Sequence, residues 1–271
     1  MVEFKTIGVL GCGNMGGALV RALVASGTAA PEDLFVYDTL PKAMETLRTE
    51  LGVRSVVQAH DLPAHADVLV LAIKPQIFHH IAPSLHPRSG PKEKVVISVM
   101  AGVTSESIRG YFPQDFQVVR VMPNLPLSVG EGATAIEVDG HSEATLLLAE
   151  HIFNAAGRTV RVTAHQMDAV TGLSGSGPAY VFEFLEGLIL AGVKAGLTRE
   201  AASILVLQTV KGSMKLLESG RESPSQWSVK VCSPGGTTIH GLHVLESSGF
   251  KGLLIEAVEA AVRRSKELSG P

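Results

Sequence analysis

The chain has 271 residues, of which 45% are apolar and 18% charged, a composition typical of a globular protein with one large domain or two modest ones. Its net charge of −3 and the lack of a basic cluster argue against a nucleic-acid partner. No uninterrupted apolar run reaches about 18 residues and no secretory signal pattern opens the chain, so we expect no membrane span and a cytoplasmic location.

Short apolar segments alternate with helical patterns in the first half of the chain. Strands are predicted at residues 5–10, 33–38, 67–73, 94–99 and 117–122, with helices at 14–26, 41–51, 75–85 and 105–111 between or after them. Two further strands, at 133–138 and 159–162, flank a helix at 142–155. Alternation of strand and helix predicts an α/β fold, a doubly wound parallel sheet with helices on both faces.

From about residue 164 onward the pattern is helical, with segments at 180–195, 199–218, 237–247 and 251–268. We therefore predict a dinucleotide-binding domain at 1–163 and a helical domain at 164–271. Residues 201–207 are apolar around the whole helix, and such a helix must be buried. A short helical domain buries little surface alone, so we expect it to dimerise; packing against the first domain is the alternative.

A glycine-rich loop lies between the first predicted strand and helix. It consists of Gly11, Cys12, Gly13, Asn14, Met15 and Gly16 and fits the pattern G-x-G-x-x-G. In this position Gly11 permits a tight turn, Gly13 lets the backbone approach a pyrophosphate, and Gly16 lets helix and strand pack closely. The helix N-terminus then binds the phosphates. The loop predicts dinucleotide binding; a purely structural turn is the alternative.

Asp38 ends the second predicted strand, about twenty residues after the loop. An acidic residue there hydrogen-bonds the adenosine ribose and repels a 2′-phosphate. The nearest cation in sequence is Lys42. Asp38 therefore favours NADH over NADPH without deciding between them, and a helix N-cap or turn role is the alternative.

Other predicted strands end in residues suited to the same cleft, because ligands bind at the carboxyl ends of parallel strands. Pro75 keeps Lys74 out of the helical region, so its amine can reach the ribose or a phosphate; a solvated surface lysine is the alternative. Asn124, in a proline-stiffened turn, contacts the nicotinamide or substrate or is a plain turn residue. Cofactor-binding candidates at these strand ends are Ala72, Lys74, Pro75, Ala101 and Gly102.

Two glycine-rich segments interrupt the helical half, at residues 172–180 and 232–241. In the second, Ser233, Thr237 and Thr238 place hydroxyl groups beside free backbone N–H groups at a helix start. This arrangement suits a small carboxylate. Simple N-capping is the alternative, but capping explains only one hydroxyl.

Together these motifs resemble the pyrroline-5-carboxylate reductase family. The run Ser233, Pro234, Gly235, Gly236, Thr237, Thr238, followed by Leu242, Val244, Leu245 and Glu246, looks like the family's signature. Residues 171–180 match its other strongly typed segment, and residues 11–16 with Lys74 and Pro75 match its cofactor half. The resemblance covers nearly the whole chain in the same motif order. The glycine loop is shared with many dehydrogenases; the two helical motifs are specific.

The resemblance implies a Rossmann domain, an interlocked helical dimerisation domain, and dimers that assemble further into a decamer of five dimers. It implies reduction of 1-pyrroline-5-carboxylate to L-proline by NADH or NADPH, the last step of proline biosynthesis. By similarity Thr238 lies near the ring nitrogen and is the catalytic candidate, and Ser176 lies by the nicotinamide. The substrate-binding candidates are Asn124, Val231, Ser233, Gly236, Thr237 and Thr238.

Three positions depart from the family pattern. Leu125 stands between Asn124 and Pro126, where the family usually has threonine, and Met100 replaces a small residue. Both changes could slightly reshape the cleft. Asp38 replaces the small or polar residue frequent in NADPH-preferring members, which leaves the cofactor choice open.

Two other functions stay open. A β-hydroxyacid dehydrogenase shares this plan and needs a cleft-facing lysine, for which Lys194, Lys211 and Lys215 are candidates by composition only. A dinucleotide-binding regulator without activity leaves residues 233–238 unexplained.

Metal and disulfide chemistry are not expected. His240 and His243 lie three residues apart, but no carboxylate or cysteine completes a metal site. We interpret Cys12 and Cys232 as reduced thiols, because they lack the spacing of a redox pair.

Overall fold

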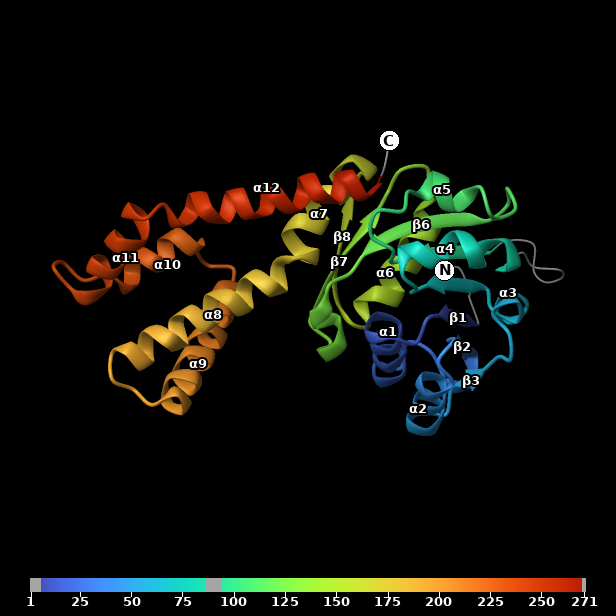
Figure 1. Ribbon diagram of the computed structural model, residues 1–271, viewed down its shortest axis with the longest axis horizontal. Helices are drawn as coiled ribbons and strands as arrows, with labels where there is room; N and C mark the ends of the chain where they lie inside the picture. The colour runs from blue at the N-terminus through green and yellow to red at the C-terminus, as the bar shows by residue number, and fades with distance from the viewer. Residues whose placement is uncertain (1–5, 86–93, 270–271) are drawn as a thin grey trace. The chain divides into compact units, whose positions relative to one another are not determined.

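The computed structural model describes residues 6–85 and 94–269, so Lys5, the first residue of a predicted strand, lies outside the described residues (Figure 1). The chain forms two compact units. One, here called the sheet unit, comprises Met1–Ser176 and Ala260–Pro271; the other, the helical unit, comprises Gly177–Glu259.

The sheet unit is built on eight strands in the order β3-β2-β1-β4-β5-β6-β7-β8. Their bounds are β1 Ile7–Leu10, β2 Leu34–Tyr37, β3 Arg54–Ser55, β4 Val68–Leu71, β5 Val95–Ser98, β6 Gln117–Met122, β7 Gly132–Glu137 and β8 Gly157–Val162. The first six follow the 3-2-1-4-5-6 order of dinucleotide-binding domains. The predicted α/β doubly wound fold is confirmed, and the strand order reverses beside β1.

The sheet is parallel except at one pair. β6 and β7 run antiparallel, with Val121 opposite Ile136 and Met122 opposite Ala135. The link between them holds only a short 3-10 turn, Leu125–Val129, whereas a parallel connection needs a crossover of a dozen or more residues. The parallel sheet expected from the alternation of strands and helices therefore also contains one antiparallel pair, which was not predicted.

Helices cover both faces of the sheet and complete two apolar layers. Leu19, Leu23 and Phe153 lie in one buried cluster, and Phe78 and Ile108 lie in the other. The helices are α1 Asn14–Ala25, α2 Pro41–Leu51, α3 Leu62–His65, α4 Pro75–Ile81, α5 Ser105–Arg109, α6 Glu143–Asn154 and α7 Met167–Val170. Further 3-10 turns are Pro31–Asp33, Ala59–Asp61, Ala82–Leu85 and Ala164–Gln166. Neighbouring residues of one strand serve opposite layers, which explains why these strands are continuously apolar.

A π-helical turn, Thr171–Gly175, follows α7 and leads directly into the next helix. The remaining helices are α8 Gly177–Lys194, α9 Arg199–Glu218, α10 Pro224–Val231, α11 Thr237–Ser247 and α12 Phe250–Ser269, which begins in the helical unit and ends in the sheet unit (Figure 1). No strand is found in the described residues beyond 164, as predicted.

The helical unit encloses almost no core. Among its described residues, Ile189 and Ala202 are the buried apolar ones, near the contact of α8 with α9. Large apolar side chains stay more than half exposed, among them Phe182, Leu190, Ile204, Leu205, Leu207 and Leu253. Such apolar exposure marks an interaction surface in a folded protein.

One helical stretch in the described residues, Ala164–Lys194, is long and apolar enough by length and composition to cross a membrane. Asp168, Glu183 and Glu186 interrupt it, so it contains no continuous apolar run of that length. A single stretch of this kind is weak evidence, because helices at protein interfaces have the same character. The absence of a membrane span stays a prediction.

Four short α-helices and strands were not predicted. β3 has two residues, and α3 and α7 have four each, too few for any periodicity to show. α10 has eight residues and carries a recognisable start, since Ser223 and Gln226 form a capping box around Pro224 at the first helical position. That pattern in the sequence could have identified α10.

Two glycines with positive φ allow the close approach of β8 to β7 to be tested. A Cβ at Gly157, with φ 145°, would lie 2.0 Å from the Gly132 carbonyl oxygen, whereas a Cβ at Gly140, with φ 75°, would meet nothing within 4 Å. Gly140→Ala should cost about 1 kcal/mol for backbone strain alone, and Gly157→Ala about 3 kcal/mol or more because the strands must separate.

Urea titrations of both variants at one protein concentration measure the difference in the free energy of unfolding. Equal losses in the two variants would contradict the close approach.

Candidate cofactor and substrate site

The central strands of the sheet end level with one another. Leu10 is the register partner of both Tyr37 and Leu71, and Leu71 is the partner of Ser98. The residues that follow these strands therefore meet at one edge of the sheet, where its strand order reverses. This edge is the ligand-binding position of doubly wound sheets.

The glycine loop at this edge is packed too closely for side chains at two of its positions. Gly11 has φ 99°, and a Cβ there would lie 2.3 Å from the Ala72 carbonyl oxygen. A Cβ at Gly16 would lie 1.9 Å from the Gly11 carbonyl oxygen and 3.0 Å from the Ala72 Cβ. Gly13 has nothing within 4 Å of its Cβ position, so space lies open over the loop.

The start of α1 suits an anion. Its N-cap residue is Gly13, no side chain caps the helix from that position, and the first turn, which includes Asn14 and Met15, carries no acidic residue. The first N–H groups of a helix have no partner within the helix and carry a partial positive charge. Open space over Gly13 and this helix start fit a dinucleotide pyrophosphate.

Asp38 is tied to the glycine loop. Its Oδ2 accepts a hydrogen bond from the Cys12 backbone N–H at 2.7 Å, and its Oδ1 accepts one from the Leu40 N–H at 2.8 Å. The bond to the Leu40 N–H, two residues further along, gives Asp38 the turn role that was the alternative to ribose binding. Each oxygen keeps a further lone pair, so the carboxylate can still accept a ribose hydroxyl.

Cys12 is buried beneath this contact. Burial, and then the charge of Asp38, raise the pKa of the Cys12 thiol to about 12. The thiol is therefore neutral at physiological pH and a weak nucleophile. Cys232 in the helical unit is half-buried and also free.

The other predicted strand-end residues have distinct surroundings. Lys74 is extended, with φ −69° and ψ 137°, and exposed, and Pro75 is the first residue of α4, as predicted. Ala101 is exposed; Gly102 has φ 74°, and its Cβ position lies 3.4 Å from the Leu268 backbone near the end of α12. Met100 is only 2% exposed and belongs to an apolar layer, so it faces the core.

Asn124 connects the end of β6 to the π-helical turn. Its Nδ2 donates to the Ser174 carbonyl at 3.2 Å, and its Oδ1 accepts from the Ala133 N–H at 2.9 Å. A Cβ at Gly175 would lie 2.7 Å from the Met122 Cε. The segment that carries Ser176 therefore packs on the carboxyl end of β6. Sequence reasoning missed the contact of Asn124 with Ser174, although Asn124 and the nearby Ser176 were both candidates.

The second group of candidates lies in the helical unit. Val231 is the last residue of α10 and is 66% exposed. The chain then turns at residues 233–236, with the Gly236 N–H donating to the Ser233 carbonyl at 3.0 Å. A Cβ at Gly236 would lie 2.2 Å from the Ser233 Oγ, so a side chain there would displace the Ser233 hydroxyl.

α11 begins at Thr237 with Gly236 as its N-cap and no capping side chain from that position. Its first turn carries no acidic residue, so the helix start is suited to a carboxylate. Thr237 is exposed and Thr238 half-buried. The His240 Nδ1 lies 2.9 Å from the Gly236 carbonyl, and since a carbonyl only accepts, Nδ1 carries the hydrogen.

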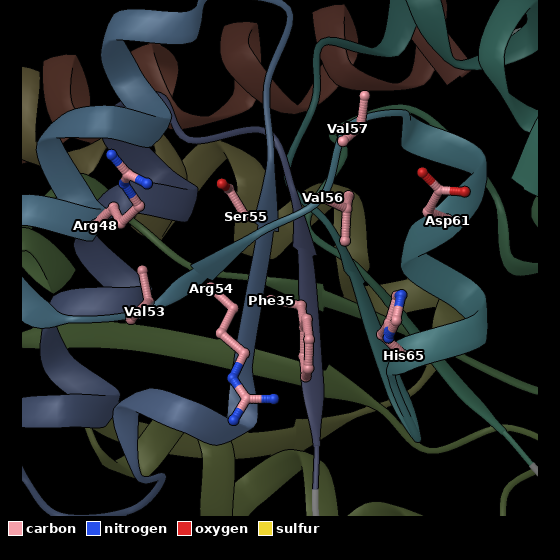
Figure 2. Close-up of a pocket in the computed structure, with 9 residues that line it drawn as sticks. All are labelled: Phe35, Arg48, Val53, Arg54, Ser55, Val56, Val57, Asp61 and His65. Carbon is pink, nitrogen blue, oxygen red and sulfur yellow. The ribbon is translucent and has the colours of Figure 1, made fainter.

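Neither of two hollows in the surface is lined by a sheet-edge candidate. One of about 510 Å³ at the β3 edge contains none of the predicted residues. There the Arg54 guanidinium lies 5.6 Å from the Phe35 ring centre and the His65 ring stacks on it at 5.0 Å, on the other side in Figure 2. The second, of about 1010 Å³, lies among α10, α11 and the start of α12. Its lining includes Cys232 and Ile239, which flank the candidate segment 233–238.

Potential metal ligands do not cluster. No group of three or more histidine, cysteine, aspartate or glutamate side chains suited to a metal is found in residues 6–85 and 94–269. The absence of a metal from the reaction stays a prediction.

Comparisons with known proteins match both parts of the chain. Residues 164–268 match the family model described as pyrroline-5-carboxylate reductase dimerisation. Residues 6–102 match the model described as NADP oxidoreductase, coenzyme F420-dependent.

Full-length relatives agree with the first of these models. A pyrroline-5-carboxylate reductase of Synechocystis sp. is 43% identical, over 97% of both chains. The solved structure of a pyrroline-5-carboxylate reductase from Coxiella burnetii is 35% identical with a TM-score of 0.91, covering 99% of this chain and 100% of that one. The structure of Plasmodium falciparum pyrroline carboxylate reductase with NADP bound is 33% identical with a TM-score of 0.86, covering 98% of each chain. This chain belongs to the pyrroline-5-carboxylate reductase family of NAD(P)H-dependent oxidoreductases.

Proposed function

We propose that the protein reduces 1-pyrroline-5-carboxylate to L-proline by hydride transfer from NAD(P)H, the last step of proline biosynthesis. The observation that carries the proposal is the match to pyrroline-5-carboxylate reductases along 97% of the chain, at 43% identity. Such a match includes the glycine loop of the sheet unit and the carboxylate motif of the helical unit. A cofactor-binding regulator would need only the first.

The sheet unit binds the cofactor, which when bound supplies the hydride. The loop of Gly11, Cys12, Gly13, Asn14, Met15 and Gly16 holds the pyrophosphate, and Ala72, Lys74, Pro75, Ala101 and Gly102 line the nicotinamide side of the cleft. Gly13 leaves the loop backbone open, and the extended, exposed Lys74 can approach a phosphate or ribose. Ser176, at the end of the π-helical turn, lies by the nicotinamide in this assignment.

NADH is the preferred cofactor in this proposal. The Asp38 carboxylate is held by the Cys12 and Leu40 N–H groups, so it cannot turn away from the end of β2 without losing both bonds. A fixed negative charge at this position attracts ribose hydroxyls and repels a 2′-phosphate. The Plasmodium falciparum relative was solved with NADP bound, so NADPH is the alternative cofactor.

The start of α11 binds the substrate carboxylate. Its free N–H groups and the hydroxyls of Ser233 and Thr237 supply hydrogen bonds, and Gly236 leaves room for the Ser233 hydroxyl. Val231 covers the ring and Thr238 faces its nitrogen. Asn124 acts by holding the Ser174 carbonyl, since both ends of its amide have backbone partners.

The reaction adds a hydride to the imine carbon and requires one proton on the ring nitrogen. The hydroxyl of Thr238 is a hydrogen-bond partner but a weak acid, so the nitrogen is protonated before hydride transfer or through a water chain. The protein mainly holds the imine carbon at near-attack distance from the nicotinamide and excludes water. Lys194, Lys211 and Lys215 are all exposed, and no observation favours the hydroxyacid reaction.

The helical unit forms the homodimer interface, and five dimers form a decamer. The exposed apolar faces of α8 and α9 support this assignment, because only Ile189 and Ala202 are buried among the described apolar residues of the unit. The family model for residues 164–268 carries dimerisation in its description. The protein acts in the cytoplasm, where its small polar substrate and cofactor are dissolved.

The reaction is tested with wild-type protein, pyrroline-5-carboxylate and either cofactor, followed at 340 nm. Thr238→Ala should lower kcat by about a hundredfold, because the ring nitrogen loses its hydrogen-bond partner. NADH affinity, measured by cofactor fluorescence, should change by less than about twofold, because Thr238 is assigned to the ring nitrogen of the substrate and to no part of the cofactor.

Thr237→Ala serves as the neighbouring control and should mainly raise the KM for the imine. Wild-type turnover by purified Thr238→Ala would remove Thr238 from the mechanism. Wild-type protein that binds NADH and reduces no cyclic imine would overturn the proposed function.

Cofactor preference is tested by Asp38→Asn, which removes the charge while the amide oxygen can still accept the Cys12 N–H. The ratio of kcat/KM for NADPH to that for NADH should rise about tenfold, because repulsion of the 2′-phosphate is lost. Glu32→Gln, an exposed carboxylate before the start of β2, is the matched control and should leave the ratio unchanged. An unchanged ratio in Asp38→Asn would show that Asp38 does not select the cofactor.

A further inference from the structure

A buried polar cluster lies in the sheet unit outside the cofactor and substrate candidates. It consists of Arg120, Glu137, Ser105, Asp168 and Ser265 and joins β6, β7, α5, α7 and α12. Arg120, Glu137 and Ser265 are 8%, 4% and 5% exposed. Charged groups buried to this degree need fixed partners.

The pair Arg120 and Glu137 joins the two antiparallel strands. The register that sets Val121 opposite Ile136 also sets Arg120 across from Glu137, and their Nη1 and Oε2 atoms are 3.5 Å apart. The Ser105 hydroxyl donates to the other Glu137 oxygen at 2.7 Å. The carboxylate is thereby fixed between β6 and the first residue of α5.

Asp168 adds a second carboxylate to this cluster. Burial lowers the pKa of Arg120, and the charges of Glu137 and then Asp168 partly offset that effect. Both carboxylates are therefore near enough to the guanidinium for their charges to act on it. The Ser265 hydroxyl donates to the Asp168 Oδ1 at 2.6 Å. This bond spans 97 residues of sequence and joins the start of α7 to the final turns of α12.

The position of Asp168 connects the cluster to the proposed nicotinamide side. α7 starts at Met167 and continues without a break into the π-helical turn Thr171–Gly175, which ends at Ser176. Gly175 packs against Met122 and the Ser174 carbonyl accepts from Asn124, so the far end of this segment rests on the carboxyl end of β6. Asp168 fixes its near end.

We propose that Ser265 and Asp168 are positioning residues, whose hydrogen bond holds the π-helical turn and Ser176 in register with the carboxyl end of β6 for hydride transfer. Neither touches the reacting atoms. A π-helical turn is rare, occurs mostly as a single turn next to α-helix, and frequently lies at a functional site. A polar cluster that joins five elements of the sheet unit can hold such a turn in place, since its members lose much of their stabilisation if one of them moves.

The first test needs no cofactor or turnover. Amide hydrogen–deuterium exchange is measured on the full-length wild type and on Ser265→Ala, with peptides covering residues 167–180. Loss of the hydrogen bond should speed exchange in this segment by at least about tenfold, while peptides of β1 and β4 stay unchanged. Ser213→Ala, which removes a helix hydroxyl bonded to the Thr209 carbonyl, is the matched control and should leave residues 167–180 unchanged.

The isosteric pair Ser265→Thr and Ser265→Val separates hydroxyl from volume. Both add the same bulk, but only threonine keeps the donor to Asp168. Threonine should restore slow exchange in residues 167–180 and valine should not. Equal behaviour of the two variants would overturn the inference.

The second test rests on the proposed function and uses the primary isotope effect of 4,4-dideuterated NADH on the reduction of pyrroline-5-carboxylate. Ser265→Ala should lower kcat about tenfold, raise the isotope effect on kcat, and leave both KM values within about twofold, because misplacement slows the hydride step. If Ser265 served only folding, Ser265→Ala would lower the concentration of active enzyme, and so the apparent kcat, without changing the isotope effect.

The two tests separate the possible failures. Inactive wild-type protein with faster exchange in Ser265→Ala would end the proposed reaction and keep the structural part of the inference. Active wild-type protein with an unchanged isotope effect in Ser265→Ala would overturn the positioning role. Loss of the folded state in Ser265→Ala, Ser265→Thr and Ser265→Val alike would also overturn it, because the contact would then be a requirement of folding.

Discussion

The functional edge of the sheet depends on one close approach between backbones. Gly11 and Gly16 lie so near the end of β4 and each other that a methyl group at either position would overlap a carbonyl oxygen. This contact sets α1 directly against β1 and leaves its first N–H groups at the point where strand order reverses. Any side chain there would push helix and strand apart and displace the phosphate position.

The charge of Asp38 secures that contact from the neighbouring strand. By accepting the Cys12 N–H it links the loop after β1 to the end of β2. In the proposed function the same carboxylate also contacts the adenosine ribose, so it would serve both the shape of the loop and the choice of cofactor. Burial, and then the nearby charge of Asp38, raise the pKa of the Cys12 thiol and keep that thiol neutral.

Much of this architecture could be predicted because local signals agreed with the fold. The glycine spacing, the extended Lys74 before Pro75 and the continuously apolar strands each have one simple structural cause. Features decided by distant contacts were missed. The Asn124 contact to Ser174 and the bond from Ser265 to Asp168 join residues 50 and 97 positions apart, and no periodicity in a single sequence reports such contacts. Two other missed features did have local signals. The short link between the strands at 117–122 and 133–138 implied an antiparallel pair, and the capping box at Ser223 and Gln226 marked the start of α10.

The nearly coreless helical unit has a consequence for how the chain matures. With Ile189 and Ala202 as its buried apolar residues among those described, a lone copy of residues 177–259 gains little from hydrophobic burial. If a second copy covers these helices, they fold only when two chains associate, so the melting temperature rises with protein concentration. Newly synthesised chains would then depend on meeting one another, and dilution alone would unfold residues 177–259.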